Sequence, residues 1–390
     1  MAAKKVLRWA LPLCAAAALA LGVAVAPAGA AETKAGSPPP AVSMSYPSFG
    51  GRLYGVTAIS PDDVWAVGLN DDGSLALHWN GSTWAPSLTP PIGYFTGVAS
   101  TSASDVWAVG GTNWFSPVQP FAEHWNGTSW TRVSTPNPPG GGYFNAVAAT
   151  SPSNAWAVGL TGGGGPGISG PSTPLIEHWN GKRWTKQSLA PVPTGSGQLT
   201  GVTAISADNA WAVGSTGATD QQTLIEHWNG FNWSQLPSPN LPGATGSYLR
   251  AVTAVARDHN SVWAVGSADV NGLSKALVLH WDGASWTIVP GNSPDGDVSL
   301  LGVVATWTSN IWAVGIIHPS TCGNGGPQCQ TLIEHWNSKR WKVLPSPNPP
   351  SAYLNLLWAA SATSRGDIWA VGTTDYGTTL IEHWNGSSWS

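Results

Sequence analysis

The sequence predicts an all-β protein, a seven-bladed β-propeller built from four-stranded antiparallel blades. Three observations predict it: a set of three tryptophan motifs occurs seven times, the repeats are 42 to 57 residues apart, and turn residues are abundant. The 390 residues include 47 Gly and 32 Pro, and a hydrophobic content of 42% excludes a disordered chain. Only 9% of the residues are charged and the net charge is -4, which argues against nucleic-acid binding.

Each repeat contains the tetrapeptide Trp-Ala-Val-Gly, then a His-Trp pair, and then a third tryptophan five residues after that pair. The tetrapeptides begin at Trp65, Trp107, Trp156, Trp211, Trp263, Trp312 and Trp369. The histidines are His78, His124, His178, His227, His280, His335 and His383. The third tryptophans are Trp84, Trp130, Trp184, Trp233, Trp286, Trp341 and Trp389. These motifs account for 21 of the 25 tryptophans, so the unusual composition is a consequence of the repeat.

Four short strands are predicted in each repeat. The first is typified by residues 55–59, the second by 64–68 and the third by 224–228, all with alternating residue types. Asn229-Gly230 then favours a tight hairpin, because both residues tolerate positive φ. The fourth strand starts near the third tryptophan and leads into proline-rich sequence, which suits the outer edge of a sheet.

The two ends of the repeat region predict how the ring closes. The chain stops at Trp389-Ser390, where the fourth strand of the seventh blade would begin, and residues 41–47 resemble the end of such a strand. We therefore expect this N-terminal segment to pair with the third strand of the last blade. A linear solenoid would need polar caps at both ends, and truncation of a longer chain is the other alternative.

The first 30 residues have the pattern of a secretory signal peptide. A short basic region precedes an apolar run, and Ala28-Gly29-Ala30 supplies the small residues that a signal peptidase requires. The predicted organisation is a signal peptide over 1–30, a linker over 31–40 and the propeller over 41–390. A secreted, extracellular monomer with no membrane insertion after cleavage is expected; a retained membrane anchor is the alternative.

The two cysteines outside the signal peptide, Cys322 and Cys329, are close in sequence. In an exported protein their pairing as a disulfide is the favoured interpretation. A zinc site is the weaker alternative, since no second pair of ligands accompanies them, and no cofactor or metal is predicted.

The repeated tryptophans and histidines are interpreted as structural. Alternation places Trp65 on one face of its strand and Ala66 and Gly68 on the other, leaving room for an indole of the neighbouring blade. Each histidine is expected to hydrogen-bond the polar residue that precedes the second strand of its blade. Those acceptors are Asp63, Asp105, Asn154, Asn209, Ser261, Asn310 and Asp367. Five repeats have glutamate before the histidine, which strand alternation directs to the opposite face; Leu77 and Leu279 take its place in the others.

Ligand-binding residues are sought where the blades differ. Tyrosine occurs at the entry to the first strand in four repeats, as Tyr94, Tyr143, Tyr248 and Tyr353. Two residues further on, the aligned positions are Tyr54, Thr96, Asn145, Thr200, Arg250, Leu301 and Asn355. Trp114 and Tyr376 are further aromatic residues in loops, without repeat equivalents. Such aromatic side chains can stack on sugar rings, or the tyrosines can simply seal the blade edges.

The segment Asp63 to Gly68, followed by a further tryptophan-bearing strand, resembles the repeats of tectonin-type propeller lectins and the Trp-rich repeats of secreted bacterial proteins. The resemblance covers residues 48–390 and implies glycan binding. This chain departs from tectonins in its longer period and in its recurring His-Trp-Asn-Gly.

The sequence thus favours a secreted, non-catalytic binding protein that recognises carbohydrate or a cell-surface polymer through the variable loops. A glycosidase or lyase with its site at the mouth of the central channel is the first alternative. It would need converging carboxylates, for which the loop acids are Asp220, Asp269, Asp295, Asp297 and Asp375. A protein-interaction scaffold is the second alternative.

Overall fold

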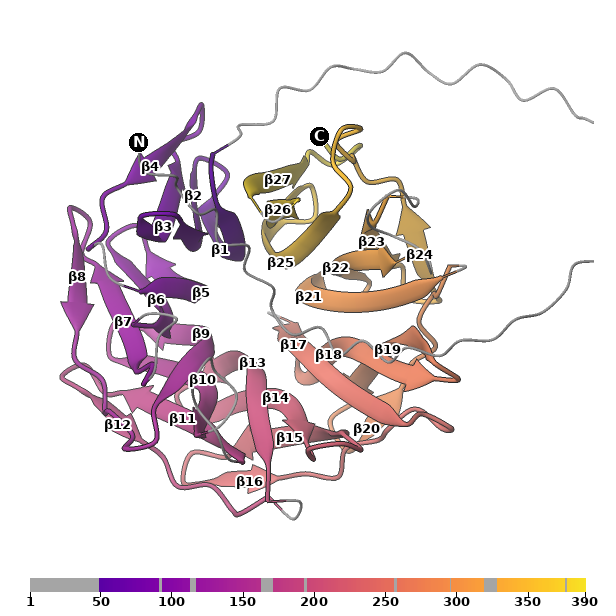
Figure 1. Cartoon of the computed structure of the whole chain (residues 1–390), viewed down its shortest axis with the longest axis horizontal. Coiled ribbons are helices and arrows are strands. Elements are labelled where there is room, and N and C mark those ends of the chain that lie inside the picture. Colours follow the sequence, from indigo (N-terminus) through magenta and orange to yellow (C-terminus); the bar gives the residue numbers. More distant parts are fainter. Residues whose placement is uncertain are drawn as a thin grey trace, which may run out of the picture. The chain divides into compact units, whose positions relative to one another are not determined.

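Each tryptophan repeat folds as one blade of a ring in the computed structural model (Figure 1). The structure describes residues 49–90, 93–112, 117–162, 171–192, 195–255, 258–294, 296–318, 328–375 and 377–390. Within these ranges there are six four-stranded sheets, one three-stranded sheet and no helix. The predicted seven-bladed propeller with four-stranded antiparallel blades is therefore confirmed.

In each blade the strands follow one another in sequence order from the ring axis outward. The innermost strands are β1 (Arg52–Ser60), β5 (Tyr94–Ser102), β9 (Gly142–Ser151), β13 (Gly197–Ser206), β17 (Gly246–Val255), β21 (Asp297–Trp307) and β25 (Asn355–Ser364). The second strands are β2 (Asp63–Asn70), β6 (Asp105–Gly111), β10 (Asn154–Gly162), β14 (Asn209–Thr216), β18 (Asp258–Val270), β22 (Asn310–His318) and β26 (Asp367–Thr374).

The third strands contain the His-Trp pairs, and the short outermost strands start at the third tryptophans. The third strands are β3 (Gly73–Trp79), β7 (Pro120–Trp125), β11 (Ser172–Trp179), β15 (Gln222–Trp228), β19 (Leu273–Trp281), β23 (Gln330–Trp336) and β27 (Thr378–Trp384). The outermost strands are β4 (Trp84–Ser87), β8 (Trp130–Val133), β12 (Trp184–Lys186), β16 (Trp233–Gln235), β20 (Trp286–Ile288) and β24 (Trp341–Leu344).

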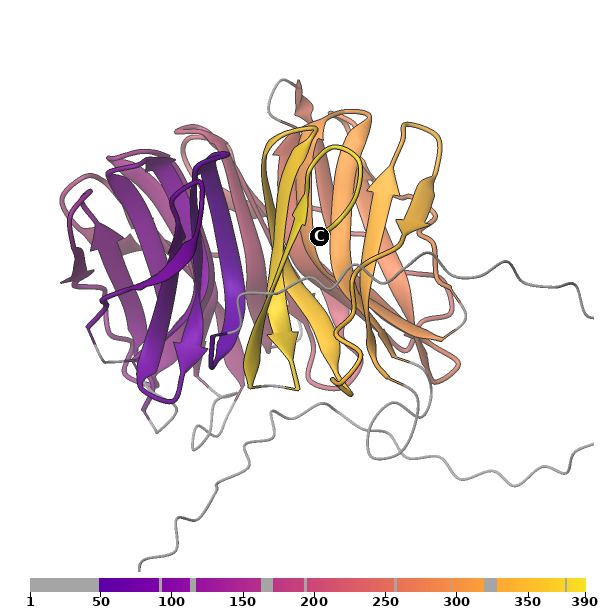
Figure 2. The same cartoon turned by 90° about the horizontal axis from the view of Figure 1, so that it is seen from above.

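The strands of all blades run between two faces of the ring (Figure 2). The innermost strand of each blade begins, and its second strand ends, at one face, which we call the loop face. The turns between first and second strands and between third and fourth strands lie at the opposite face, which we call the turn face.

Indole rings join each blade to the next. Trp65 of the first blade lies 4.9 Å from Trp125 and 5.2 Å from Trp130 of the second blade, the latter edge to face. The same two contacts recur at every blade boundary, at centroid distances of 4.9–5.4 Å and 5.1–5.8 Å. These tetrapeptide tryptophans are at most 4% exposed, so the prediction that they pack between blades is confirmed.

The seam between the last and first blades uses the same contacts, with Trp369 packed against Trp79 and Trp84. In addition, residues 49–51 and the C-terminal Ser390 both pair with the last blade at β27. The Thr379 N–H donates to the Phe49 carbonyl at 3.0 Å, while the Ser390 N–H donates to the His383 carbonyl at 2.9 Å. Closure by an N-terminal segment is thus supported at residues 49–51; the expected pairing residues 41–47 lie outside the described residues.

A β-bulge interrupts every innermost strand and explains the glycine of the tetrapeptide. A Cβ on Gly68 would lie 1.8 Å from the Arg52 carbonyl oxygen, and at the six equivalent glycines the clash is 1.8–2.0 Å. The prediction that this glycine makes room for an indole of the next blade is wrong, because the bulge of the adjacent strand places a backbone carbonyl against the glycine. The same prediction holds for the alanine of the tetrapeptide, since Trp65 packs with Ala108 of the next blade.

The predicted histidine network is present in all seven blades. Each histidine Nε2 lies 2.6–3.1 Å from the predicted Asp, Asn or Ser side chain. The imidazole also packs on the tetrapeptide tryptophan of its own blade, at 4.1–4.6 Å between ring centroids. These contacts fix the turn before the second strand and make the histidines structural.

Candidate functional site

The bulges place one side chain per blade on the inner wall of the ring, close to the loop face. The preceding residue of each strand is fully buried in its blade and the following one is Gly or Ala, and the bulge residue lies on the innermost strand, at the edge of the blade that lines the ring axis. The seven bulge residues are Tyr54, Thr96, Asn145, Thr200, Arg250, Leu301 and Trp358.

Three consecutive bulge residues hold neighbouring blades together. The Thr96 hydroxyl donates to the Phe144 carbonyl, the Asn145 amide donates to the Leu199 carbonyl, and the Thr200 hydroxyl donates to the Leu249 carbonyl, each at 2.7 Å. Each acceptor belongs to the innermost strand of the next blade. These polar groups are therefore engaged in the wall and are poor candidates for ligand binding.

An aromatic pair occupies the wall where the last blade meets the first. The rings of Tyr54 and Trp358 lie 5.6 Å apart at an interplanar angle of 64°, and both side chains are half-buried. Leu301 of the sixth blade is partly buried and packs, like Trp358, against the small apolar cluster that contains Leu354 and Leu356. Together these three side chains form an apolar surface at which a sugar ring can stack.

Arg250 of the fifth blade is exposed and lies with its guanidinium 5.8 Å from the centroid of the Tyr248 ring. Water reaches this side chain, yet the surrounding blades displace much of the bulk solvent, so burial lowers the pKa of Arg250. Its positive charge in turn opposes the rise in the pKa of Tyr143 that burial causes. Tyr143 belongs to the third blade and Arg250 to the fifth, so the charge of Arg250 acts across the fourth blade.

Two other predicted tyrosines, Tyr94 and Tyr248, make contacts within their own blades. Tyr94 is only 3% exposed, and burial strongly raises its pKa. Its hydroxyl occupies the space next to Gly111, where a Cβ would lie 2.6 Å away. The Tyr248 hydroxyl donates to Asp269 Oδ2 at 2.9 Å. For Tyr94 the structural alternative, in which tyrosine seals the blade edge, describes the observed contacts better than ligand binding does.

The alignment of the seventh repeat was wrong. The strand register makes Leu356 the equivalent of Tyr94, and Trp358 rather than Asn355 the bulge residue. Tyr353 precedes β25 and is 60% exposed, with its backbone N–H bound to Asp375 Oδ1. Spacing could have revealed Trp358: the bulge residue precedes the tetrapeptide tryptophan by 11 residues in six of the seven blades.

Several predicted positions lie outside the described residues, namely Trp114, Tyr376, Cys322 and Asp295. Cys329 is described and is 4% exposed, with its N–H donating to the Tyr353 carbonyl. The Cys322–Cys329 disulfide stays a prediction.

Two loop acids converge at the loop face of the fifth and sixth blades. Asp269 Oδ1 accepts from the Ser274 hydroxyl at 3.4 Å, and Asp297 Oδ1 accepts from the Ser274 N–H at 2.7 Å. His318 pairs with Asp297 across the β21–β22 ladder, and burial lowers the pKa of this histidine. Asp375 binds backbone N–H groups instead.

The five glutamates before the histidines are buried, which the sequence reading missed. They are at most 1% exposed, and burial raises the pKa to about 8, or about 7 for Glu226. They are Glu123, Glu177, Glu226, Glu334 and Glu382. Their place is taken by fully buried Leu77 and Leu279 in the other two blades, so a neutral side chain suits this position. The signal was available, because the residue two positions before each glutamate, on the same strand face, is Leu or Phe and the residue two positions after it is Trp.

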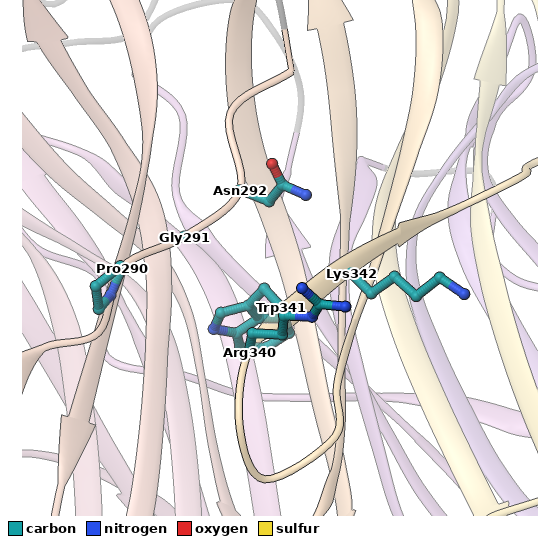
Figure 3. A pocket seen from close by; sticks show the side chains of 6 residues that line it. All are labelled: Pro290, Gly291, Asn292, Arg340, Trp341 and Lys342. Atoms are coloured by element: carbon teal, nitrogen blue, oxygen red, sulfur yellow. The ribbon is translucent and has the colours of Figure 1, made fainter.

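Two shallow cavities lie at the outer rim rather than on the inner wall. One of about 320 Å³ is lined by Pro290, Gly291 and Asn292 of the fifth blade and by Arg340, Trp341 and Lys342 of the sixth. Figure 3 shows the Trp341 ring on the side of the Pro290–Asn292 segment and the Lys342 side chain pointing away from it. The other, of about 250 Å³, is lined by Arg132, Ser134, Thr135 and Asn137. The indole that lines the first cavity, Trp341, is only 4% exposed, and the second cavity has no aromatic lining, so neither offers an open aromatic surface to a ligand.

Neither a metal site nor a membrane span is found in the part of the chain that the structure covers. No three His, Cys, Asp or Glu side chains gather there closely enough to hold a metal ion. No helix there is long and apolar enough to cross a bilayer.

Comparison with known proteins extends to the fold alone. No protein-family model and no curated protein matches this chain. Among solved structures it is similar to a PL25 polysaccharide lyase, ulvan lyase bound to a GlcA–Rha3S unit, with a TM-score of 0.57 and 10% identity over 88% of this chain and 96% of that one. It is also similar to YCF48 bound to D1 peptide, with a TM-score of 0.51 and 16% identity over the same shares. YjhT matches with a TM-score of 0.51 and 12% identity over 77% of this chain and 99% of that one.

Proposed function

We propose that the protein is a secreted, non-catalytic binding protein that recognises carbohydrate, or a saccharide polymer of a cell surface, at the inner wall near the loop face. The observation that carries this proposal is the Tyr54–Trp358 pair, two half-buried aromatic rings on the same inner wall that carries the exposed Arg250 of the fifth blade. Aromatic faces bind the apolar faces of sugar rings, and polar neighbours then orient the hydroxyl groups. The signal-peptide pattern of residues 1–30 supports secretion.

Fold neighbours support the general role without deciding the ligand. One of them is a lyase bound to a saccharide and another is bound to a peptide, so this architecture accommodates both. The aromatic pair favours the saccharide for this chain, because adjacent rings offer stacking surface without the backbone partners that an extended peptide requires.

A glycan array tests the proposal directly. The wild-type protein is expected to bind a defined group of saccharides, and Trp358→Ala to lose most of that signal, because the stacking surface is removed. Phe231→Ala is the matched control: Phe231 is 90% exposed in a turn at the opposite face, and its replacement should leave binding unchanged. Equal signals from wild type and Trp358→Ala would contradict the proposed site.

The second candidate function is a polysaccharide-cleaving enzyme, and the convergence of Asp269 and Asp297 on Ser274 favours it. Both carboxylates accept hydrogen bonds from neighbouring residues of the fifth blade, and this local role is why we place the enzymatic function second. Incubation with the saccharides that bind in the array, followed by analysis of chain length, separates the two functions. Cleavage that Asp269→Asn abolishes would establish the enzyme; intact polymer supports the binding protein.

A further inference from the structure

We propose that Arg250 binds an acidic group, a carboxylate or a sulfate ester, of the saccharide that the inner wall recognises. This inference rests on the proposed saccharide-binding function and specifies the class of its ligand. It would make the protein a receptor for acidic polysaccharides rather than for neutral ones.

The first argument is that Arg250 has no ion-pair partner among the residues that the structure describes. In the described ranges the side-chain ion pairs within 4 Å are all between a histidine and an aspartate, and Arg250 belongs to none of them. Asp269 is the one acid with an electrostatic effect on Arg250, and the two side chains form no ion pair within 4 Å. An exposed, unpaired guanidinium in partly desolvated surroundings gains more from an anion than one in bulk water does.

The second argument is that Arg250 is positioned before any ligand arrives. Its backbone is held in the bulge of β17, where Leu249 before it is fully buried and Ala251 after it is paired with β18. Its guanidinium lies over the Tyr248 ring, and the Tyr248 hydroxyl is in turn anchored to Asp269. A guanidinium so placed presents its planar donors to one carboxylate or sulfate at little further cost in side-chain entropy.

The third argument is the charge of the wall itself. Among the seven bulge residues Arg250 is the one charged side chain, the others being two aromatic, three polar and one aliphatic. The wall thus offers one cationic point together with the Tyr54–Trp358 surface. A polymer of acidic sugars satisfies both, since one residue can pair with Arg250 while another stacks.

The test measures binding of matched acidic and neutral polymers by biolayer interferometry. Polygalacturonate is compared with its fully methyl-esterified form, and dextran sulfate with dextran; poly-L-glutamate is the peptide probe. The variants are Arg250→Gln, Arg250→Lys and the control Arg183→Gln, which removes the same charge from an exposed turn at the opposite face. Thermal unfolding of each variant verifies folding.

We expect tighter binding of polygalacturonate or dextran sulfate than of its neutral counterpart, and a loss of about tenfold or more in Arg250→Gln. Arg250→Lys should retain part of the affinity, and Arg183→Gln all of it. The arm that binds identifies a carboxylate or a sulfate ligand. Equal binding of acidic and neutral polymers, or no effect of Arg250→Gln, would overturn the inference while leaving saccharide binding in place. Arg250-dependent binding of poly-L-glutamate at equal strength would overturn the assignment to a saccharide, and binding of no polymer would contradict both proposals.

Discussion

At the scale of single residues, Ser338 marks a local departure from the repeat. The turn after the third strand has glycine in six blades, each with φ between 86° and 97°, and Ser338 in the sixth blade with φ 74°. An L-residue in this left-handed region is strained, because its Cβ approaches the backbone.

Ser338→Gly should therefore stabilise the protein by about 1 kcal/mol, which corresponds to roughly 2 °C in Tm for a domain of this size. Differential scanning calorimetry measures the change. Lys339→Gly, at the next position of the same turn but without positive φ, is the control and should lower Tm slightly. A Tm of Ser338→Gly at or below that of the wild type would refute this reading of the turn.

Single residues also show what the sequence could and could not predict about the site. The histidine pairs were predictable, because donor and acceptor recur at fixed places in all seven repeats. Trp358 was missed because the seventh repeat was aligned from its loop instead of from Trp369. Arg250 was among the candidate ligand-binding residues that the sequence offered. The role of Thr96 at the equivalent position was not predictable, since only its hydrogen bond to the next blade shows that it is engaged in the wall.

At the scale of elements, the third strand carries a group whose ionisation opposes folding. The pKa of the buried glutamates is raised in the folded state to about 8, or about 7 for Glu226, from 4.5. The folded state prefers these carboxyl groups protonated. Their contribution to the free energy of unfolding is therefore fully present below pH 4.5 and is lost as the pH rises through the folded-state pKa. Burial lowers the pKa of several histidines from 6.5, so these histidines change their protonation below that pH. A change in stability between pH 7 and 8.5 therefore reports on the glutamates.

We expect Tm to fall between pH 7 and pH 8.5 in the wild type. Glu177→Leu, which reproduces the natural Leu77 and Leu279, should raise Tm at pH 8.5 by a few degrees and reduce this slope. Asp208→Asn, the loss of an exposed carboxylate, should leave the slope unchanged. A wild-type Tm that is constant or rises over this window would contradict the raised pKa of these groups.

The element scale is where sequence-based reasoning was most successful. Alternating patterns and turn residues predicted every strand type, because each strand has one face toward a neighbouring blade. The glycine of the tetrapeptide was misread, since the bulge that requires it lies in a different strand, at a position whose residue type varies from Tyr54 to Arg250.

At the scale of the whole molecule, the account depends on a closed ring. Tyr54 belongs to the first blade and Trp358 to the last, so the aromatic pair exists only if these blades meet. The seam is formed by Trp369 against Trp79 and Trp84, and by the pairing of residues 49–51 with β27. The ring was predictable from seven repeats of the same three tryptophan motifs, whereas the identity of the pairing residues required the structure.

Thermal unfolding of two truncated chains tests the closed ring most directly. A chain that starts at residue 41 retains the pairing segment, and one that starts at residue 52 lacks it. We predict that the first unfolds like the mature protein, while the second unfolds several degrees lower and loses saccharide binding together with the Tyr54–Trp358 contact. If the chain that starts at residue 52 unfolds at the same temperature and in the same single transition as the longer one, the N-terminal segment does not hold the first and last blades together.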